Sequence, residues 1–147
     1  MKRGPAAQLI WKWAAAHQLQ KWDEACGTCV VVVNGRAVKS SNFPIRRAQG
    51  AEILTVEGIS RGMEVHPVQT AIAESGAVQC GFCTPSIVME LYALLEAGPH
   101  VSEREMVNAL NKHLCRCNGY EPILNGARNA QQVMAEVDSR QLTVDSG

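Results

Sequence analysis

Two stretches of sequence decide the fold: Val78-Gln79-Cys80-Gly81-Phe82-Cys83-Thr84-Pro85 and Leu114-Cys115-Arg116-Cys117-Asn118-Gly119-Tyr120. Each stretch holds a close pair of cysteines, and each is followed by residues that favour the start of a helix. Pro85 suits a first helical turn because its missing N–H would have no partner there. The Asn-Gly pair in the second stretch makes a turn, and Pro122 follows it as a helix opener. The sequence therefore predicts two cysteine pairs, each just upstream of a helix.

Four thiolates from two such pairs suit two kinds of metal site. They can surround one zinc ion, or they can hold the two irons of a [2Fe–2S] cluster. Spacing alone does not choose between these sites. The position before helix starts favours the cluster, because free N–H groups there stabilise the negative charge of its thiolates. A Cys-x-Cys pair is also less usual for zinc.

A third chemistry is a thiol oxidoreductase that uses Cys80 and Cys83. A Cys-x-x-Cys pair at a helix start does lower a thiol pKa. The βαβ pattern that precedes this motif in thioredoxin-like proteins is absent from the chain. The thiol oxidoreductase is therefore the least favoured of the three.

The residues around the two stretches predict an all-helical unit over residues 61–140. A helix over 65–74 ends at Gly76, and a second over 87–97 stops at Gly98-Pro99. Ser102 and Glu105 form a capping box for a third helix, which is expected to run to about Leu114. A fourth runs from Pro122 to about Val137, and residues 141–147 are expected to be a frayed tail.

Residues 1–60 predict a helix followed by a small sheet. Good helix formers fill 8–20, and residues 21–28 suit a loop. Four valines over 30–33, the pair Asn34-Gly35 and the run 36–39 predict a β-hairpin. A third strand is expected over 53–56. The fold class is therefore α+β.

Composition excludes several classes of partner. The chain has 147 residues, 14 basic and 14 acidic side chains and a net charge of zero. No Lys/Arg stripe exists, so nucleic acid is not expected as a partner. No apolar run approaches the roughly 20 residues that span a membrane, so no membrane insertion is expected.

The cysteines and the first residues bear on the compartment. The six cysteines fall in three tight pairs, which favours metal ligation over a disulfide framework. Lys12 interrupts the apolar run at 9–11, which argues against a secretory signal. A cytoplasmic location is expected, with the periplasm as the alternative if a partner carries the export signal.

The two cysteine stretches closely resemble the [2Fe–2S]-binding domain of the molybdenum hydroxylase family. That family includes xanthine dehydrogenase, aldehyde oxidoreductase and the molybdenum type of carbon monoxide dehydrogenase. The resemblance extends from about Glu64 to Val137. One departure is Ser86, where family members usually carry glycine, and it is not expected to affect ligation.

The resemblance implies roles for individual residues. The ligands of the cluster nearest the molybdenum would be Cys80, Cys83, Cys115 and Cys117. Gln79 would lie against the pterin of the molybdenum cofactor, held by a large partner subunit. Arg116, Gly119 and Tyr120 would shape the ligand loop.

The resemblance also implies a function. The chain would be the non-catalytic electron-transfer subunit of an oxidoreductase, relaying electrons from the molybdopterin site towards a subunit with FAD or a cytochrome. The alternative of a different class is a structural zinc-binding interaction module.

The N-terminal part resembles a plant-type ferredoxin of the β-grasp fold, with departures. Ala25 to Val30 and the hairpin carry this resemblance. The ferredoxin pattern needs Cys-x₄-Cys-x₂-Cys and one distant cysteine. Cys26 and Cys29 supply its middle two ligands, whereas Lys21 and Ser41 stand where the outer two should be.

We therefore expect a truncated or degenerate ferredoxin-like domain over residues 1–60. Cys26 and Cys29 would be the remnant of a second cluster site. The alternatives are completion of that site by a partner or by an unusual ligand such as Asp23.

Overall fold

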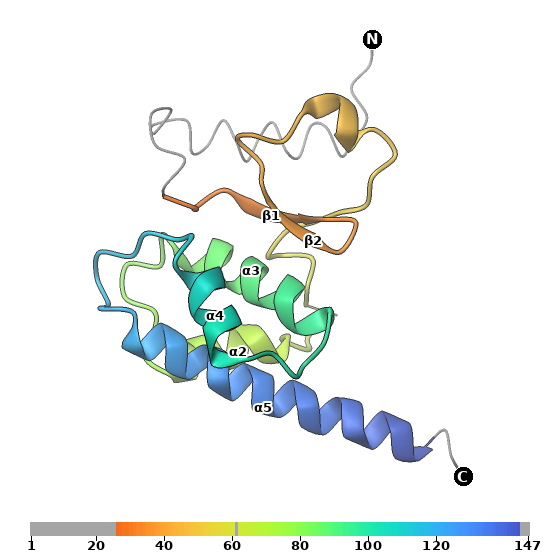
Figure 1. Cartoon of the computed structure of the whole chain (residues 1–147), viewed down its shortest axis with the longest axis vertical. Helices are drawn as coiled ribbons and strands as arrows, with labels where there is room; N and C mark the ends of the chain where they lie inside the picture. The colour runs from red at the N-terminus through yellow and green to blue at the C-terminus, as the bar shows by residue number, and fades with distance from the viewer. Residues whose placement is uncertain (1–25, 61, 145–147) are drawn as a thin grey trace.

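The computed structural model describes residues 26–60 and 62–144 of the chain. The expected helix over 8–20, and Lys21 and Asp23 with it, lie outside the described residues. A small antiparallel sheet lies above a layer of helices, and the longest helix closes the opposite side (Figure 1). The described elements are β1 (Val30–Val33), β2 (Arg36–Lys39), the 3₁₀ turn η2 (Ile45–Ala48), β3 (Ile53–Leu54), α2 (Pro67–Glu74), α3 (Thr84–Glu96), α4 (Glu103–Leu110) and α5 (Glu121–Val144).

The sheet grows from the hairpin that Asn34-Gly35 predicts. Both residues have positive φ angles, 49° and 77°, as a two-residue hairpin turn requires. β2 and β3 pair with opposite edges of β1, both antiparallel, which gives the order β2-β1-β3. All four valines of β1 are buried, because this central strand has its neighbours on both sides and α3 beneath it.

Local signals set the starts of two helices. The expected capping box of α4 is present, with Ser102 and Glu105 bonding each other's backbone N–H groups. α2 begins with a second capping box that the sequence analysis did not predict, formed by His66 and Gln69. Its end follows expectation, since Gly76 takes the left-handed conformation at φ +71°.

One hydrophobic core joins the sheet to the helices. Val30 and Val32 of β1 belong to the same buried cluster as Ile72 of α2, Leu91 of α3 and Ile123 of α5. The helix packing is tightest between α2 and α5, where Gly126 lets the two backbones approach. The mixture of helices with one small sheet confirms the α+β class.

Three expected element ends differ from the structure. The third strand ends at Leu54 rather than 56, because residues 55–58 form a turn in which the Gly58 N–H bonds the Thr55 carbonyl. α4 ends at Leu110 rather than near Leu114, because the Leu114 N–H donates to the carbonyl of Cys26 instead. α5 continues to Val144, beyond the expected end near Val137, since no Gly or Pro occurs between these two residues.

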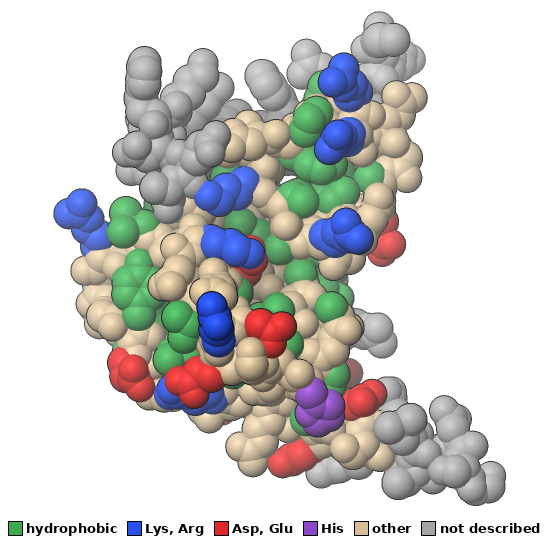
Figure 2. Space-filling view, viewed as in Figure 1, with side chains coloured by type: hydrophobic (Ala, Val, Ile, Leu, Met, Phe, Trp, Pro, Cys, Tyr) green, Lys and Arg blue, Asp and Glu red, His purple; other side chains and the backbone are tan. Residues whose placement is uncertain are grey.

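Charge is mixed on the visible surface. On the face in Figure 2, basic side chains lie from the top into the lower half, and acidic ones lie mainly in the lower half, beside some of the basic ones. Across the part of the chain that the structure describes, no helix is both long and apolar enough to cross a membrane.

Candidate metal centre

Two loops carry the four cysteines that the sequence singles out. Cys80 and Cys83 lie between α2 and α3, and Cys83 is the residue directly before α3. Cys115 and Cys117 lie between α4 and α5. Each pair therefore does precede a helix, as the sequence predicts.

The two loops face each other and bring the thiols together in two contacts. The Cys117 thiol is hydrogen-bonded to the sulfur of Cys80, and the Cys83 thiol to that of Cys115. Within residues 26–60 and 62–144, no three Cys, His, Asp or Glu side chains gather around one point as a single ion would need. Two pairs of thiols, one from each loop, fit a [2Fe–2S] cluster, whose two irons share four cysteine ligands.

The two contacts differ in burial. Cys83 is 7% exposed and Cys115 is half-buried, whereas Cys80 and Cys117 are exposed. A group held by all four would have one side in the protein interior and the other at the surface.

The environment of the thiols also differs. The backbone N–H of Phe82 and the Cys117 thiol both donate to Cys80 and lower its pKa. Burial, and then the hydrogen bond to Cys115, raise the pKa of Cys83 to about 12. Donation to Cys80 raises the pKa of Cys117.

Tyr120 holds the second loop in shape. Its hydroxyl donates to the carbonyl of His113 at 2.8 Å and accepts from the N–H of Cys115 at 3.0 Å. Its own backbone has φ +65°, a rare conformation for a non-glycine residue. Asn118 fixes the same loop to the end of α2 by donating to the Gly76 carbonyl at 3.1 Å.

Exposed apolar side chains flank the cysteines in the sequence of both loops. Val78, Phe82 and Leu114 are 41%, 57% and 48% exposed and flank the cysteines of both loops. Gln79 is also exposed, beside Cys80. Such a rim is typical of a surface that another protein covers.

The remaining cysteines, Cys26 and Cys29, lie beside hydroxyls. The Cys26 sulfur is 3.4 Å from Thr28 Oγ1, and the Cys29 sulfur is 3.3 Å from Ser41 Oγ. Ser41, expected at an outer ligand position of the ferredoxin pattern, thus does lie next to Cys29. The chain has six cysteines, so only these two remain for a second site, and a four-thiolate cluster does not fit there.

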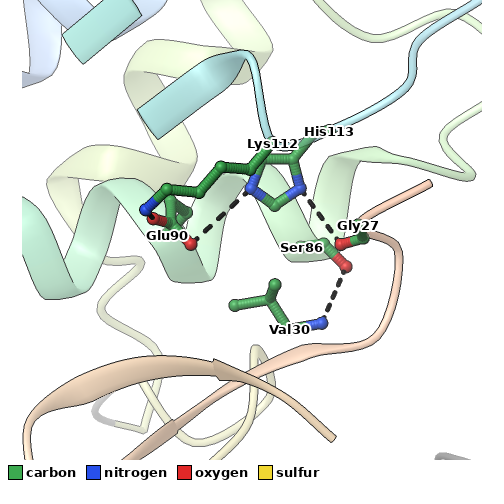
Figure 3. A network of polar contacts seen from close by, with 6 residues as sticks. All are labelled: Gly27, Val30, Ser86, Glu90, Lys112 and His113. Atoms are coloured by element: carbon green, nitrogen blue, oxygen red, sulfur yellow. Dashed lines mark hydrogen bonds and ion pairs between the residues drawn. The ribbon is translucent and has the colours of Figure 1, made fainter. Parts of the chain in front are cut away.

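A polar network links Gly27, which lies between these two cysteines in the sequence, to His113, two residues before Cys115 (Figure 3). His113, which is buried, contacts the Gly27 carbonyl through Nδ1 at 3.1 Å and faces Glu90 through Nε2 at 3.7 Å. Lys112 forms an ion pair with the same carboxylate. The sequence does not predict this network, since its residues come from three distant segments and form no local motif.

Comparison with known proteins places the chain in a family. Residues 55–128 match the family model of the [2Fe-2S] binding domain. The chain belongs to this family, and it is homologous to the iron–sulfur regions of aldehyde oxidase and xanthine dehydrogenase.

The sequence relatives are large oxidoreductases. Aldehyde oxidase 2 of Cavia porcellus is 45% identical over 115 residues, 71% of this chain and 9% of that protein. Xanthine dehydrogenase/oxidase of Rattus norvegicus is 42% identical over 113 residues, 70% of this chain and 8% of that protein. The chain thus spans under a tenth of the curated relatives it matches.

Solved structures with a similar fold are also oxidoreductases. Aldehyde oxidoreductase from Desulfovibrio gigas superposes with a TM-score of 0.75 at 26% identity, over 92% of this chain and 16% of that chain. Quinoline 2-oxidoreductase from Pseudomonas putida 86 superposes with a TM-score of 0.70 at 29% identity, over 80% of this chain and 75% of that chain.

Proposed function

We propose that this chain is an electron-transfer subunit that holds one [2Fe–2S] cluster on Cys80, Cys83, Cys115 and Cys117. The observation that carries the proposal is the meeting of these four thiols from two loops, in two contacts, at the surface edge of the core. The cluster supplies one-electron storage when bound. The division of the chain into a degenerate ferredoxin-like part over 1–60 and a helical cluster domain over 61–140 belongs to the same proposal.

The residues of the chain hold and insulate the group. Tyr120 and Asn118 fix the ligand loop, so the thiols are positioned before the metal arrives. The N–H of Phe82 donates to the Cys80 sulfur and stabilises its negative charge. The core around Cys83 keeps water away from one side.

The exposed side faces a partner in this proposal. Val78, Phe82 and Leu114 supply apolar contact area around Cys80 and Cys117. The partner would be a large subunit with the molybdopterin cofactor, and Gln79 would meet its pterin. Electrons would leave one at a time for an FAD or cytochrome subunit, in the cytoplasm or, if a partner is exported, in the periplasm.

Anaerobic purification with assays of iron, zinc and acid-labile sulfide tests the proposal. We expect about two irons and two sulfides per chain and one rhombic EPR signal after dithionite reduction. The variant Cys83→Ala should lose iron and signal. Zinc without sulfide would instead identify the chain as a structural zinc module.

A further inference from the structure

We infer that the backbone of Cys26 and Gly27 is a positioning element for the cluster ligand Cys115. In this chain, positioning that ligand is the role of the loop that carries Cys26 and Cys29. The inference rests on the proposed cluster at Cys80, Cys83, Cys115 and Cys117. It departs from the ferredoxin pattern, in which this loop would ligate a cluster of its own.

The first support is a direct backbone contact next to the ligand. The N–H of Leu114 donates to the carbonyl of Cys26 at 2.9 Å. Leu114 directly precedes Cys115, and this bond is the reason that α4 ends at Leu110. The loop at 26–27 thus sets where the chain leaves α4 and enters the ligand loop.

A second contact acts one residue earlier. The carbonyl of Gly27 lies 3.1 Å from Nδ1 of His113, which donates because a carbonyl can only accept. The backbone carbonyl of His113 in turn accepts from the Tyr120 hydroxyl, and the same hydroxyl accepts from the N–H of Cys115. Hydrogen bonds on the ring and on the backbone carbonyl of His113 therefore link Gly27, through this residue and Tyr120, to the ligand Cys115.

The third support is the fit of Gly27 itself. A Cβ at this position would lie 2.3 Å from the Lys112 carbonyl oxygen and 2.9 Å from His113 Nδ1. The near atom is backbone, so it cannot move aside without displacing the segment that leads to Cys115. Gly27 is buried and has φ +67°, whereas Gly35, in the turn of the hairpin that follows, has φ +77° and no heavy atom within 4 Å of its Cβ position.

The strand that follows the loop is anchored as well. The N–H of Val30 donates to the fully buried Ser86 hydroxyl at 3.4 Å (Figure 3). Ser86 lies in the first turn of α3, three residues after the ligand Cys83. The segment 26–30 therefore contacts the polypeptide near two of the proposed ligands, the buried Cys83 and the half-buried Cys115.

The thiols of the segment do not fit a cluster of the ordinary kind. Only Cys26 and Cys29 remain in the chain, and the Cys29 sulfur contacts the Ser41 hydroxyl at 3.3 Å. The backbone contacts use no thiol.

The test compares Gly27→Ala with Gly35→Ala in the full chain, loaded with iron. Both variants place alanine at a positive φ, but only the first creates a collision. We expect Gly27→Ala to change the EPR g-values and midpoint potential and to lose iron to a chelator about tenfold faster, the usual size of an outer-sphere effect. Gly35→Ala should match the parent protein in all three readouts.

Two further variants keep the test decisive. If Gly27→Ala does not fold, His113→Leu, which removes the donor to the Gly27 carbonyl together with the contact to Glu90, should shift the potential. His113→Asn, whose amide can again donate to that carbonyl, should restore part of it. The double variant Cys26→Ser, Cys29→Ser should retain the iron content and g-values of the parent.

The possible failures are distinguishable. An iron content near zero in the parent protein would refute the proposed cluster itself. With the parent loaded, unchanged g-values, potential and iron loss in the folded Gly27→Ala variant, or in His113→Leu in its place, would overturn the positioning role. Loss of iron from the double cysteine variant would show that the pair ligates metal and would overturn the inference as well.

Discussion

At the scale of single residues, Glu90 is the charged group that α3 places in the interior. It is 7% exposed, and its carboxylate faces Lys112 and His113. Burial raises the pKa of Glu90, but the contacts with His113 and Lys112 outweigh burial and hold that pKa below its usual range. The ionised form of Glu90 is therefore more stable, relative to the protonated form, in the folded chain than in the unfolded one.

The sign of the pH dependence follows from that lowered pKa. The contribution of Glu90 to stability is complete above the unfolded pKa of about 4.3 and is lost as the pH falls through the lower folded value. Glu90→Gln should reduce the free energy of unfolding by about 2 kcal/mol at pH 7. Urea denaturation of both proteins at several pH values measures this difference, which should shrink below pH of about 4. A difference that stays constant into acid would contradict the assignment.

Tyr120→Phe is a substitution that changes a single group, because phenylalanine keeps the aromatic ring and leaves the backbone at φ +65°. Tyr120→Phe removes only the hydroxyl that joins the His113 carbonyl to the Cys115 N–H. We expect a loss of about 1–2 kcal/mol in the free energy of unfolding. Iron release to a chelator should also accelerate, since the loop that carries Cys115 loses both hydrogen bonds of the Tyr120 hydroxyl. Release at the parental rate would show that Asn118 alone suffices to hold the loop.

At the scale of elements, the packing of α2 against α5 depends on Gly126. Glycine inside a helix usually costs about 1 kcal/mol relative to alanine, so Gly→Ala should normally stabilise. Here a Cβ would lie 2.7 Å from Ser75 Oγ and 2.8 Å from Ile72 Cδ1. Gly126→Ala should therefore destabilise by about 1–3 kcal/mol, the range of overpacked cores. Thermal unfolding measures the change.

Gly98→Ala is the matched control for that substitution. Gly98 follows α3, has no positive φ and has no heavy atom within 4 Å of its Cβ position. Alanine there should leave the melting temperature equal or slightly raised, because it restricts the unfolded chain. A Gly126→Ala protein as stable as Gly98→Ala would mean that α2 and α5 can separate slightly without cost.

The helices and strands also show which structural features can be predicted from the sequence. The hairpin at Asn34-Gly35 and the capping box at Ser102 were predicted correctly because both are local signals, set within a few residues. The end of α4 was placed wrongly because it depends on Leu114 bonding Cys26, far away in sequence. Periodicity near Leu114 carries no information about that partner.

At the scale of the whole molecule, the same contrast applies to the candidate site. The spacing of Cys80, Cys83, Cys115 and Cys117 predicts the meeting of the two loops, because each pair stands before its own helix. The Glu90–His113–Gly27 network could not be predicted, since neither hydrophobic pattern nor spacing marks a buried polar contact between distant segments. The domain division near residue 60 stays a prediction. Whether the sheet and the helices unfold together or separately tests it.

The shared core makes a specific prediction about that cooperativity. Val30 and Val32 of β1 pack in one cluster with the side chains of α2, α3 and α5, and the Val30 N–H bonds Ser86. The hairpin should therefore unfold together with the helices. Native-state hydrogen exchange should give the amides of β1 and of the middle of α3 equal opening free energies.

A substitution in the strand sharpens this prediction. Val32→Ala removes two buried methyl groups and should lower the free energy of unfolding by about 2 kcal/mol. In a single cooperative unit, the exchange of α3 amides should accelerate as much as that of β1 amides, although the substitution lies in the sheet. If only the β1 amides accelerate, the hairpin opens by itself, and residues 26–60 form a separate unit docked on the helices. The positioning contacts at Gly27 would then break and re-form without unfolding the cluster site, and iron retention would no longer follow the stability of the sheet.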